Sequence, residues 1–276
     1  MSINKSSLIE AVRKCSIEDL QSVLDEGKED IDGAGDFMIT PLHLAVLRMF
    51  EQGVTLLLER GAQINVRNAS QQTPLHWSCL VENKNMICIL LEKGADINCI
   101  DRDRMSPLNL AVLRGSKEGV ELLLTRGADL NIQDMTGDTP LHCATKNGNL
   151  HIVEMLINNG AKLKLKNNKG YTALHIAAMT SQRSILRSLL LYGAEVDAQD
   201  HSGSTPLHLI LQGQYNSEAG VVEDLLDWGA SLIIRDKDGD TPLILAAQKL
   251  GPVYGLIKHF TKLQCVDLQL AYKTSY

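Results

Sequence analysis

Aromatic residues and long apolar runs are scarce in this sequence. Phe, Trp and Tyr make up 4% of the 276 residues, a share that suits a core of small aliphatic side chains. A run of about 18 consecutive apolar residues, as a membrane-spanning helix requires, is absent, and residues 1–14 contain no apolar signal segment. We therefore expect a cytoplasmic or nuclear protein that does not bind membranes.

A surplus of positive charge and paired cysteines are also missing. The net charge of −6 argues against a general nucleic-acid binder, because such proteins need a basic face to displace counterions from phosphates. The six cysteines form no Cys-x-x-Cys motif and no Cys/His pair at zinc-finger spacing, so we expect reduced thiols and no metal site. They are Cys15, Cys79, Cys88, Cys99, Cys143 and Cys265.

Catalytic motifs are absent as well. The sequence has no nucleophile elbow, phosphate-binding loop, His-Glu-x-x-His motif or paired-carboxylate pattern. Residues 236–240, Asp-Lys-Asp-Gly-Asp, superficially resemble a calcium loop, but the Gly position and the missing later Glu do not fit. We expect no enzymatic activity and no cofactor.

What the sequence does contain is a recurring tetrapeptide of the type Thr-Pro-Leu-His. Its copies are 33 residues apart five times and 36 apart once. A Gly-Ala pair follows the same spacing, so a three-residue insertion lies inside one unit, near residues 212–220. The tetrapeptides begin at Thr40, Thr73, Ser106, Thr139, Thr172, Thr205 and Thr241, and the pairs at Gly61, Gly94, Gly127, Gly160, Gly193 and Gly229.

Each unit has the pattern of two short helices. The Thr is a suitable N-cap, and Pro takes the first helical position, where no backbone donor is needed. Apolar residues recur at helical spacing in a second segment, as in residues 120–124 and 152–157. The Gly of each Gly-Ala pair can adopt the left-handed conformation that ends a helix. A short extended excursion with a tight turn then leads to the next unit.

A period of 33 residues with this tetrapeptide resembles the ankyrin repeat, over about residues 8–270. The resemblance implies an all-α repeat solenoid of about eight units, each a helix-turn-helix pair with a short β-hairpin loop. The first repeat lacks the tetrapeptide, as expected for a degenerate cap. The expected boundaries are 1–35 for this cap, 36–68, 69–101, 102–134, 135–167 and 168–200 for five repeats, 201–236 for the repeat with the insertion, and 237–276 for the C-terminal repeat or cap.

Histidines occupy the fourth tetrapeptide position in five different repeats, so no two of them share a turn. We interpret them as structural side chains that link the backbone and Thr hydroxyls of adjacent units. They are His43, His76, His142, His175 and His208, whereas His151, His201 and His259 form no recognisable site. Trp77 is expected to pack in the core, and Trp228 either contacts a partner or packs against the insertion.

Ankyrin proteins bind partners in a groove made by the loop tips and the exposed face of each first helix, and the resemblance implies such a site here. Many of these positions carry apolar residues where a purely structural repeat would be polar, and a contiguous apolar patch marks an interface. We expect the patch to be centred on repeats two to five. The expected contact residues are Phe37, Ile39, Leu47, Arg48, Leu80, Val81, Met105, Leu113, Arg114, Met135, Lys146, Tyr171 and Met179.

The resemblance also implies a modification. Ankyrin repeats are substrates of an asparaginyl hydroxylase that prefers a Leu eight residues before the Asn and an acidic residue two before it. Asn98 follows Leu90 and Asp96 at these distances, and Asn131 has the same pattern. The alternative is that both Asn side chains only order their turns.

The expected function is a non-enzymatic interaction module that is monomeric by itself. It would bind a protein partner as an adaptor, scaffold or inhibitor. Three alternatives stay open: the N-terminal ankyrin array of a larger protein such as a channel or ligase, a substrate-recruiting subunit of a ubiquitin ligase, and a transcription-factor inhibitor resembling the inhibitors of NF-kappaB. A fold alone does not choose among them.

Overall fold

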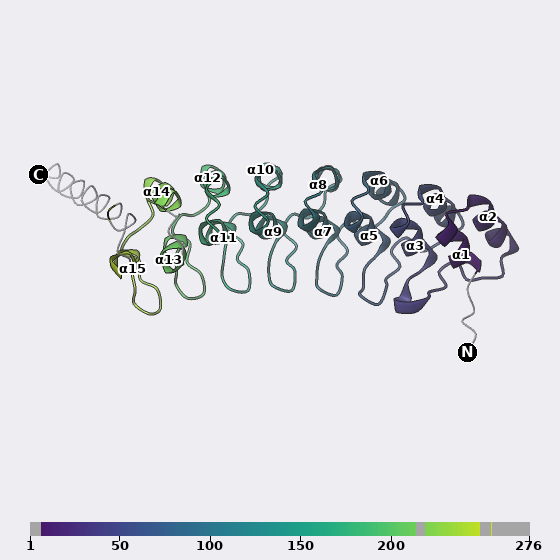
Figure 1. The fold of residues 1–276 in the computed structure, drawn as a ribbon, viewed down its shortest axis with the longest axis horizontal. Helices are drawn as coiled ribbons and strands as arrows, with labels where there is room; N and C mark the ends of the chain where they lie inside the picture. The colour runs from purple at the N-terminus through teal and green to yellow at the C-terminus, as the bar shows by residue number, and fades with distance from the viewer. Residues whose placement is uncertain (1–6, 214–218, 249–254, 256–276) are drawn as a thin grey trace, which may run out of the picture. The chain divides into compact units, whose positions relative to one another are not determined.

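The computed structural model describes residues 7–213, 219–248 and 255. This part of the chain forms 15 α-helices and one 3-10 turn and contains no β-strand (Figure 1). Four predictions concern residues outside this part of the chain: those about His259, Cys265, the inner part of the insertion and the end of the C-terminal repeat. The helices are α1 (Ser7–Lys14), α2 (Ile17–Glu26), α3 (Pro41–Leu47), α4 (Glu51–Glu59), α5 (Pro74–Leu80), α6 (Lys84–Glu92), α7 (Pro107–Arg114), α8 (Lys117–Thr125), α9 (Pro140–Lys146), α10 (Leu150–Asn158), α11 (Ala173–Met179), α12 (Arg183–Leu191), α13 (Pro206–Gln212), α14 (Ala219–Asp227) and α15 (Pro242–Gln248), with the 3-10 turn η1 at Asp36–Met38.

Two compact units divide the chain, Met1–Met135 and Thr136–Tyr276, here called the first and second unit. In the first unit each odd-numbered helix, or first helix, packs against the even-numbered second helix that follows it. The first helices α1, α3, α5 and α7 also pack on one another in sequence, and so do the second helices α2, α4, α6 and α8. The first unit is therefore a two-layered stack of helix pairs.

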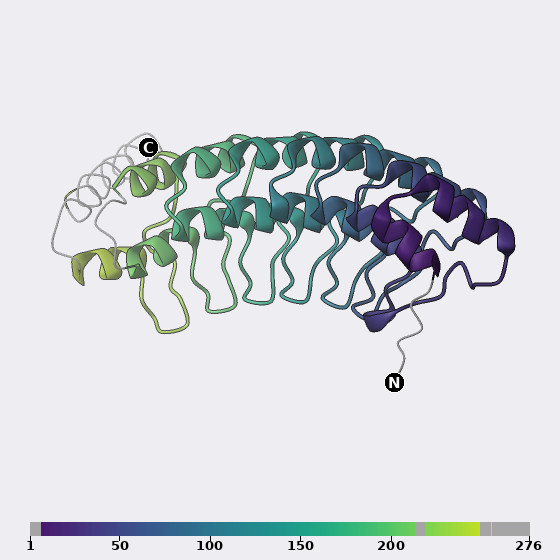
Figure 2. The ribbon, with the colours of Figure 1, turned by 45° about the vertical axis from the view of Figure 1, so that its right-hand side comes forward.

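The second unit repeats this arrangement with α9 to α15. Its first helices α9, α11, α13 and α15 pack in sequence, and its second helices α10, α12 and α14 form the other layer. Each unit is thus a stack of helix pairs, as expected for an all-α solenoid of ankyrin repeats. Figure 2 shows that within each unit the loops extend from the layer of first helices.

The local sequence explains why the first helices begin where they do. Thr40 has an extended backbone, its hydroxyl accepts a hydrogen bond from the His43 amide at 3.4 Å, and Pro41 takes the first helical position. Second helices use other caps, because Asn83 and Ser116 accept from amides of their first turns. The core consists of fully buried aliphatic side chains: Leu42, Val46, Val54 and Leu57 in one repeat, with their equivalents in the others.

The loops are tight turns rather than strand pairs. In the loop before α5 the Asn68 amide donates to the Gln72 carbonyl at 3.0 Å, and the Asn68 side chain accepts from the Ser70 and Gln72 amides. Neighbouring loops are joined by single backbone bonds, such as Arg102 N to Ser70 O at 2.9 Å. A single cross-link per loop makes no ladder, which is why the expected β-hairpins contain no strand in the described residues.

The first repeat lacks the tetrapeptide and starts its helix in another way. The Glu29 carboxylate accepts hydrogen bonds from the Ser7 amide at 2.9 Å, the Ser7 hydroxyl and the Leu8 amide at 3.2 Å. An acidic group at a helix N-terminus satisfies free donors and complements the helix dipole. Glu29 therefore replaces the missing Thr cap of α1 from the end of the same repeat.

Candidate partner-binding face

The tetrapeptide histidines are buried parts of the scaffold. The Thr73 amide donates to His76 Nδ1 at 3.1 Å, so the ring proton lies on Nε2, which donates to the Met105 carbonyl of the next repeat at 3.0 Å. His142 and His175 make the same bridge to Tyr171 and Ser204. The structural interpretation of these histidines is confirmed, and burial lowers the pKa of His175 to about 4.

One cluster in the first unit has the composition of a nucleophilic site. The Cys99 sulfur lies 3.3 Å from the Thr73 hydroxyl and 3.6 Å from His76 Nδ1. Burial raises the pKa of Cys99 to about 11, and His76 is already committed to backbone partners. The thiol is therefore protonated and unreactive at neutral pH, and the cluster is a packing arrangement.

The described residues offer no alternative metal site. They contain no group of three or more His, Cys, Asp or Glu side chains placed to hold a metal ion. The carboxylate of Asp236, in the calcium-like segment, accepts from the amides of Asp238 at 3.1 Å and Asp240 at 2.9 Å. It orders the turn from within.

Within the first unit, the expected contact residues on the first helices form a row. Leu47, Leu80 and Leu113 occupy the same position in successive repeats, near the C-terminal ends of α3, α5 and α7. Leu47 is 48% exposed, Leu113 is 51% exposed and Leu80 is half-buried. We call these three the leucine row. Since α3, α5 and α7 are neighbours, the row crosses three adjacent helices.

Other expected contact residues of the first unit differ in exposure. Phe37 at the first loop tip is 79% exposed, and Arg48, Arg114 and Met135 are exposed as well. Three more are only half-buried, which limits what each can offer a partner: Ile39, Val81 and Met105.

In the second unit the expected patch is weaker. Lys146 pairs with the buried carboxylate of Asp138, which also accepts from the Asn167 amide group, so Lys146 serves an internal network. Tyr171 is half-buried and its ring stacks on His175 at 5.9 Å. Met179 is the expected apolar contact that stays well exposed in this unit.

Two exposed methionines escaped the sequence analysis. Met38 and Met49 both have a φ of 56° and both are more than half exposed. Glycines occupy the equivalent places in other repeats, Gly137 for the loop position and Gly115 for the helix end. The sequence signal was available, because a Met stands where the repeat pattern has Gly.

The two tryptophans differ in exposure. Trp77 is half-buried rather than fully in the core, since its indole N–H donates to Gln72 Oε1 at 3.0 Å. Trp228 is exposed, in line with the contact interpretation. It belongs to the second unit, as do the exposed Leu191 and Tyr192 at the C-terminal end of α12 and the exposed Ile233 in the loop after α14.

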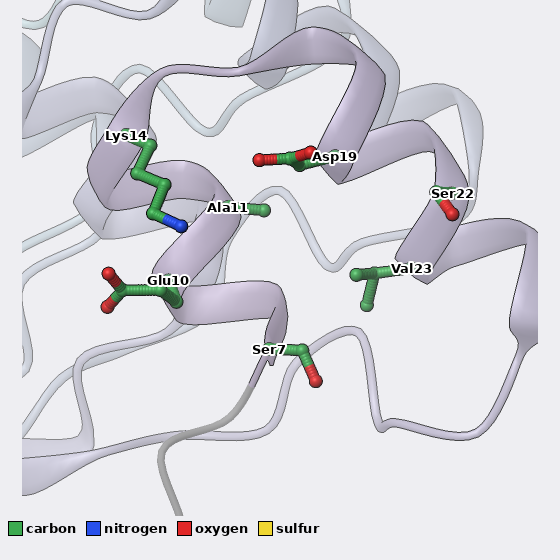
Figure 3. Close-up of a pocket in the computed structure, with 7 residues that line it drawn as sticks. All are labelled: Ser7, Glu10, Ala11, Lys14, Asp19, Ser22 and Val23. Carbon is green, nitrogen blue, oxygen red and sulfur yellow. The ribbon is translucent and has the colours of Figure 1, made fainter.

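A shallow depression lies between α1 and α2 of the first unit (Figure 3). Its volume is about 420 Å³, and polar or charged side chains provide five of its seven lining residues. Figure 3 shows these side chains spread along the two helices without converging on one point. A polar outer surface is what a terminal repeat needs, because it meets water instead of another repeat.

Comparisons with known proteins agree with this architecture. A family model described as ankyrin repeats in three copies matches residues 8–101, 42–134 and 108–200. Among solved structures, the ankyrin repeat domain of Bcl-3, titled a unique member of the IkappaB protein family, superposes with a TM-score of 0.74. It is 27% identical, and the match covers 82% of this chain and 100% of that one. Comparison with curated protein sequences gives no significant match. None of the described helices has the length and apolar character needed to cross a membrane.

Proposed function

The chain belongs to the ankyrin-repeat family, whose repeats are protein-interaction modules, and we propose that it acts as a non-enzymatic adaptor, scaffold or inhibitor that binds a protein partner. The leucine row is the observation that carries this proposal. Leu47 and Leu113 expose large aliphatic side chains on helices whose other apolar residues are buried or, for Leu44, half-buried. Apolar side chains in a row across adjacent elements lose water favourably when a partner covers them.

The proposed contact surface is smaller than the sequence alone suggested. It consists of the leucine row together with Phe37, Arg48 and Arg114. The half-buried positions outside the leucine row and Lys146 contribute less, because their side chains are already covered or paired. A few well-placed residues dominate most interfaces, so a short surface is sufficient.

Affinity capture followed by mass spectrometry tests this function. We expect wild-type protein and the control variant Leu191→Glu to recover the same partner, whereas Leu47→Glu combined with Leu113→Glu loses it. Leu191 is 71% exposed in the second unit, so the control places the same new charge on another exposed leucine. Circular dichroism confirms that all variants are folded. Retention of the partner by the double variant, or its loss in Leu191→Glu alone, contradicts the proposed location.

A second candidate function is inhibition of a transcription factor. The similarity to the Bcl-3 domain over all of that domain favours it. If the chain works in this way, it binds purified NF-kappaB with a dissociation constant below about 1 μM. Absence of binding by fluorescence anisotropy removes this candidate and leaves the adaptor and scaffold roles.

We also propose that Asn98 and Asn131 are sites of asparaginyl hydroxylation. Asn98 Oδ1 accepts from the Asp129 amide at 2.9 Å, and the Asn131 amide donates to the Asp129 carboxylate at 2.9 Å. The enzyme must therefore open these turns before it reacts. Mass spectrometry after co-expression with such a hydroxylase is expected to show one added oxygen on each residue. Unmodified Asn98 and Asn131 peptides contradict the proposal.

The remaining expectations stay proposals. We place the protein in the cytoplasm or nucleus as a monomer, supported by five free cysteines among the described residues. Size-exclusion chromatography with light scattering and imaging of a tagged chain test the two statements separately.

A further inference from the structure

The first unit carries arginines that its own structure does not neutralise. We propose that the face of the unit that carries these arginines binds an acidic amphipathic helix of the partner, a proposal that rests on the function proposed above. The face, called the inner face below, consists of the leucine row and the exposed guanidinium groups of Arg48, Arg102, Arg104 and Arg114.

A row of three cations elsewhere in the same unit is paired. Arg60, Lys93 and Arg126 precede the repeated glycines and reach a carboxylate of the preceding repeat, at 2.7, 3.7 and 3.6 Å. This row lies at the ends of the second helices α4, α6 and α8. Each of these cations is neutralised by a carboxylate of the repeat before it, so the row needs no outside anion.

The four arginines of the inner face have no such partners. Within the described residues none of them forms an ion pair. Three donate only to backbone carbonyls: Arg48 to Arg13, Arg102 to Ala69 and Arg104 to Gln133. A guanidinium has five donors, and one neutral acceptor leaves its charge and most of its donors available to a carboxylate.

The positions of the arginines and leucines place them on one side of the unit. The second helices cover one side of α3, α5 and α7, and the loops extend from the other (Figure 2). Arg102 and Arg104 belong to a loop, and Arg48 and Arg114 follow the leucines at the ends of α3 and α7. Charged and apolar groups therefore border the same open side.

The spacing of the leucine row suits a helix. Packed helices lie about 8–10 Å apart, so neighbouring leucines of the row repeat at about that distance. Residues seven apart on an α-helix share a face and are about 10.5 Å apart, which matches. On an extended strand, residues two or four apart share a face and are about 6.6 or 13 Å apart, and neither distance matches the spacing of the leucines. One apolar helix face can therefore meet all three leucines.

The loop tips give an independent indication that side chains on this face are used. Met38, Gln71 and Arg104 occupy the same loop position with φ of 56–61°, a backbone region that is unfavourable for a residue with a side chain. The second unit has Gly137 and Gly170 at this position. The first unit retains side chains where Gly would relieve the strain, as binding sites do.

A nucleic acid is the competing ligand for an arginine-rich face. Exposed acidic residues share the same loops and helix ends, namely Asp36, Glu82 and Asp103, and they would repel a continuous phosphate backbone. The leucine row also has no charged or hydrogen-bonding side chain for a phosphate, and the chain has a net charge of −6, which disfavours a polyanion. The mixed face favours separate carboxylates on an apolar helix over a polyanion.

The test uses the full chain and defined probes in fluorescence anisotropy. The main probe is a labelled peptide of about 20 residues, long enough to span about 30 Å, with Leu on one helical face and Glu elsewhere. A second peptide has Lys in place of Glu, a third has the same composition with the Leu positions scrambled, and a fourth probe is a single-stranded oligonucleotide. We expect the acidic helical peptide to bind at least tenfold more tightly than each of the others, with an affinity that falls as salt rises.

Charge reversal with a matched control locates the binding. Arg48→Glu combined with Arg114→Glu is expected to weaken the acidic peptide roughly tenfold or more. Lys84→Glu combined with Lys117→Glu changes the net charge by the same amount in the same unit, but at the starts of the second helices α6 and α8, and is expected to leave binding within about twofold.

Replacing the strained loop tips separates a binding role from a folding role. Met38→Gly, Gln71→Gly and Arg104→Gly together are expected to keep or raise the melting temperature while weakening the acidic peptide. Equal binding of the acidic and basic peptides, preference for the oligonucleotide, or an equal effect of both charge-reversal pairs overturns the proposal. If the captured cellular partner is lost in the leucine variant but the acidic peptide does not bind, this inference fails and the proposed function stands.

Discussion

At the scale of single residues, buried histidines hold successive repeats together only in their neutral form. Each Nδ1 accepts a hydrogen bond, as His175 does from the Thr172 amide at 3.1 Å, and each Nε2–H donates to a carbonyl in the next repeat. A proton on Nδ1 would set two donors against each other. Burial also lowers the pKa of His43, His76 and His175, because the charged form of a histidine is costly away from water.

This arrangement predicts that stability falls in mild acid. The unfolded chain takes up protons on these histidines near the ordinary pKa of 6.5, whereas folded His175 does so only near 4. Between these values the unfolded state binds more protons, so the free energy of unfolding decreases as pH falls through this window. His175 alone contributes on the order of 3 kcal/mol to the loss. Urea unfolding at about pH 7, 5 and 4 measures it.

The control for this prediction comes from the chain itself. Asn109 replaces the histidine in one repeat and still forms the capping box with Ser106. We therefore expect His175→Asn to fold, to be less stable at neutral pH and to lose less stability on acidification. An unchanged pH dependence in His175→Asn would assign the effect to other groups.

Asp224 is a second residue whose single side chain stabilises the fold. Its buried carboxylate accepts two hydrogen bonds from Arg183 and two from Arg187, all at 2.7–2.8 Å, and these arginines lower the pKa of Asp224 to about 2. Asp224→Asn removes the anion that both arginines share, which leaves Arg187 without an anion and Arg183 with only the exposed Glu223. We expect a loss of about 1–2 kcal/mol, limited because both guanidiniums are partly exposed to water.

Thermal unfolding of Asp224→Asn and Glu223→Gln compares a buried with an exposed partner of the same arginine. Glu223 is about half exposed and meets Arg183 at 3.3 Å. The change at Glu223 should be within about 0.5 kcal/mol, because exposed pairs contribute little. Equal losses in the two variants would argue against the special role of Asp224.

At the scale of elements, the sequence predicted the helices well because their signals are local. Thr40 as N-cap, Pro41 at the first position and a left-handed Gly at the end act within one turn, so pattern alone identifies them. The exposure of groove residues depends on neighbouring repeats. Met105 and Tyr171 are half-buried, and their carbonyls accept hydrogen bonds from His76 and His142 of the preceding repeat at 3.0 and 2.9 Å, a contact that spacing alone does not reveal.

The residues with left-handed backbone conformation also could not be predicted from the sequence alone. Met38 and Met49 interrupt a pattern of glycines, but only the backbone angles show that these methionines keep the glycine conformation instead of changing the turn. The unpaired state of the inner-face arginines likewise required the structure, because the pairing of Arg60 with Asp25 and the freedom of Arg48 from carboxylates follow from distances.

The glycine positions give a prediction at this scale. A Cβ on Gly170 would lie 2.4 Å from the His201 amide nitrogen of the next loop, whereas a Cβ on Gly160 would meet nothing within 4 Å. Both residues have positive φ. Gly160→Ala should therefore cost only the backbone strain, about 1 kcal/mol, and Gly170→Ala should cost at least about 1–2 kcal/mol more. Urea unfolding measures both, and equal costs would show that the loops separate freely.

At the scale of the whole molecule, a solenoid is built from contacts between neighbours in sequence. In both units each helix packs on its partner and on the equivalent helices one repeat away. The stability of such a chain is a sum of local terms and nearest-neighbour terms, and parts of it open separately. The effect of a core cavity should consequently be greatest close to the cavity.

Two matched cavities test this locality. Leu57 in α4 and Leu156 in α10 are both fully buried on second helices, one in each unit. Leu57→Ala and Leu156→Ala should each cost about 2–5 kcal/mol. In hydrogen exchange followed by mass spectrometry, we expect each variant to lose protection mainly in its own unit, because the lost packing belongs to neighbouring repeats there. A uniform loss over both units in either variant would mean that the chain unfolds as one cooperative body, and a cavity in the second unit would then weaken the inner face as well.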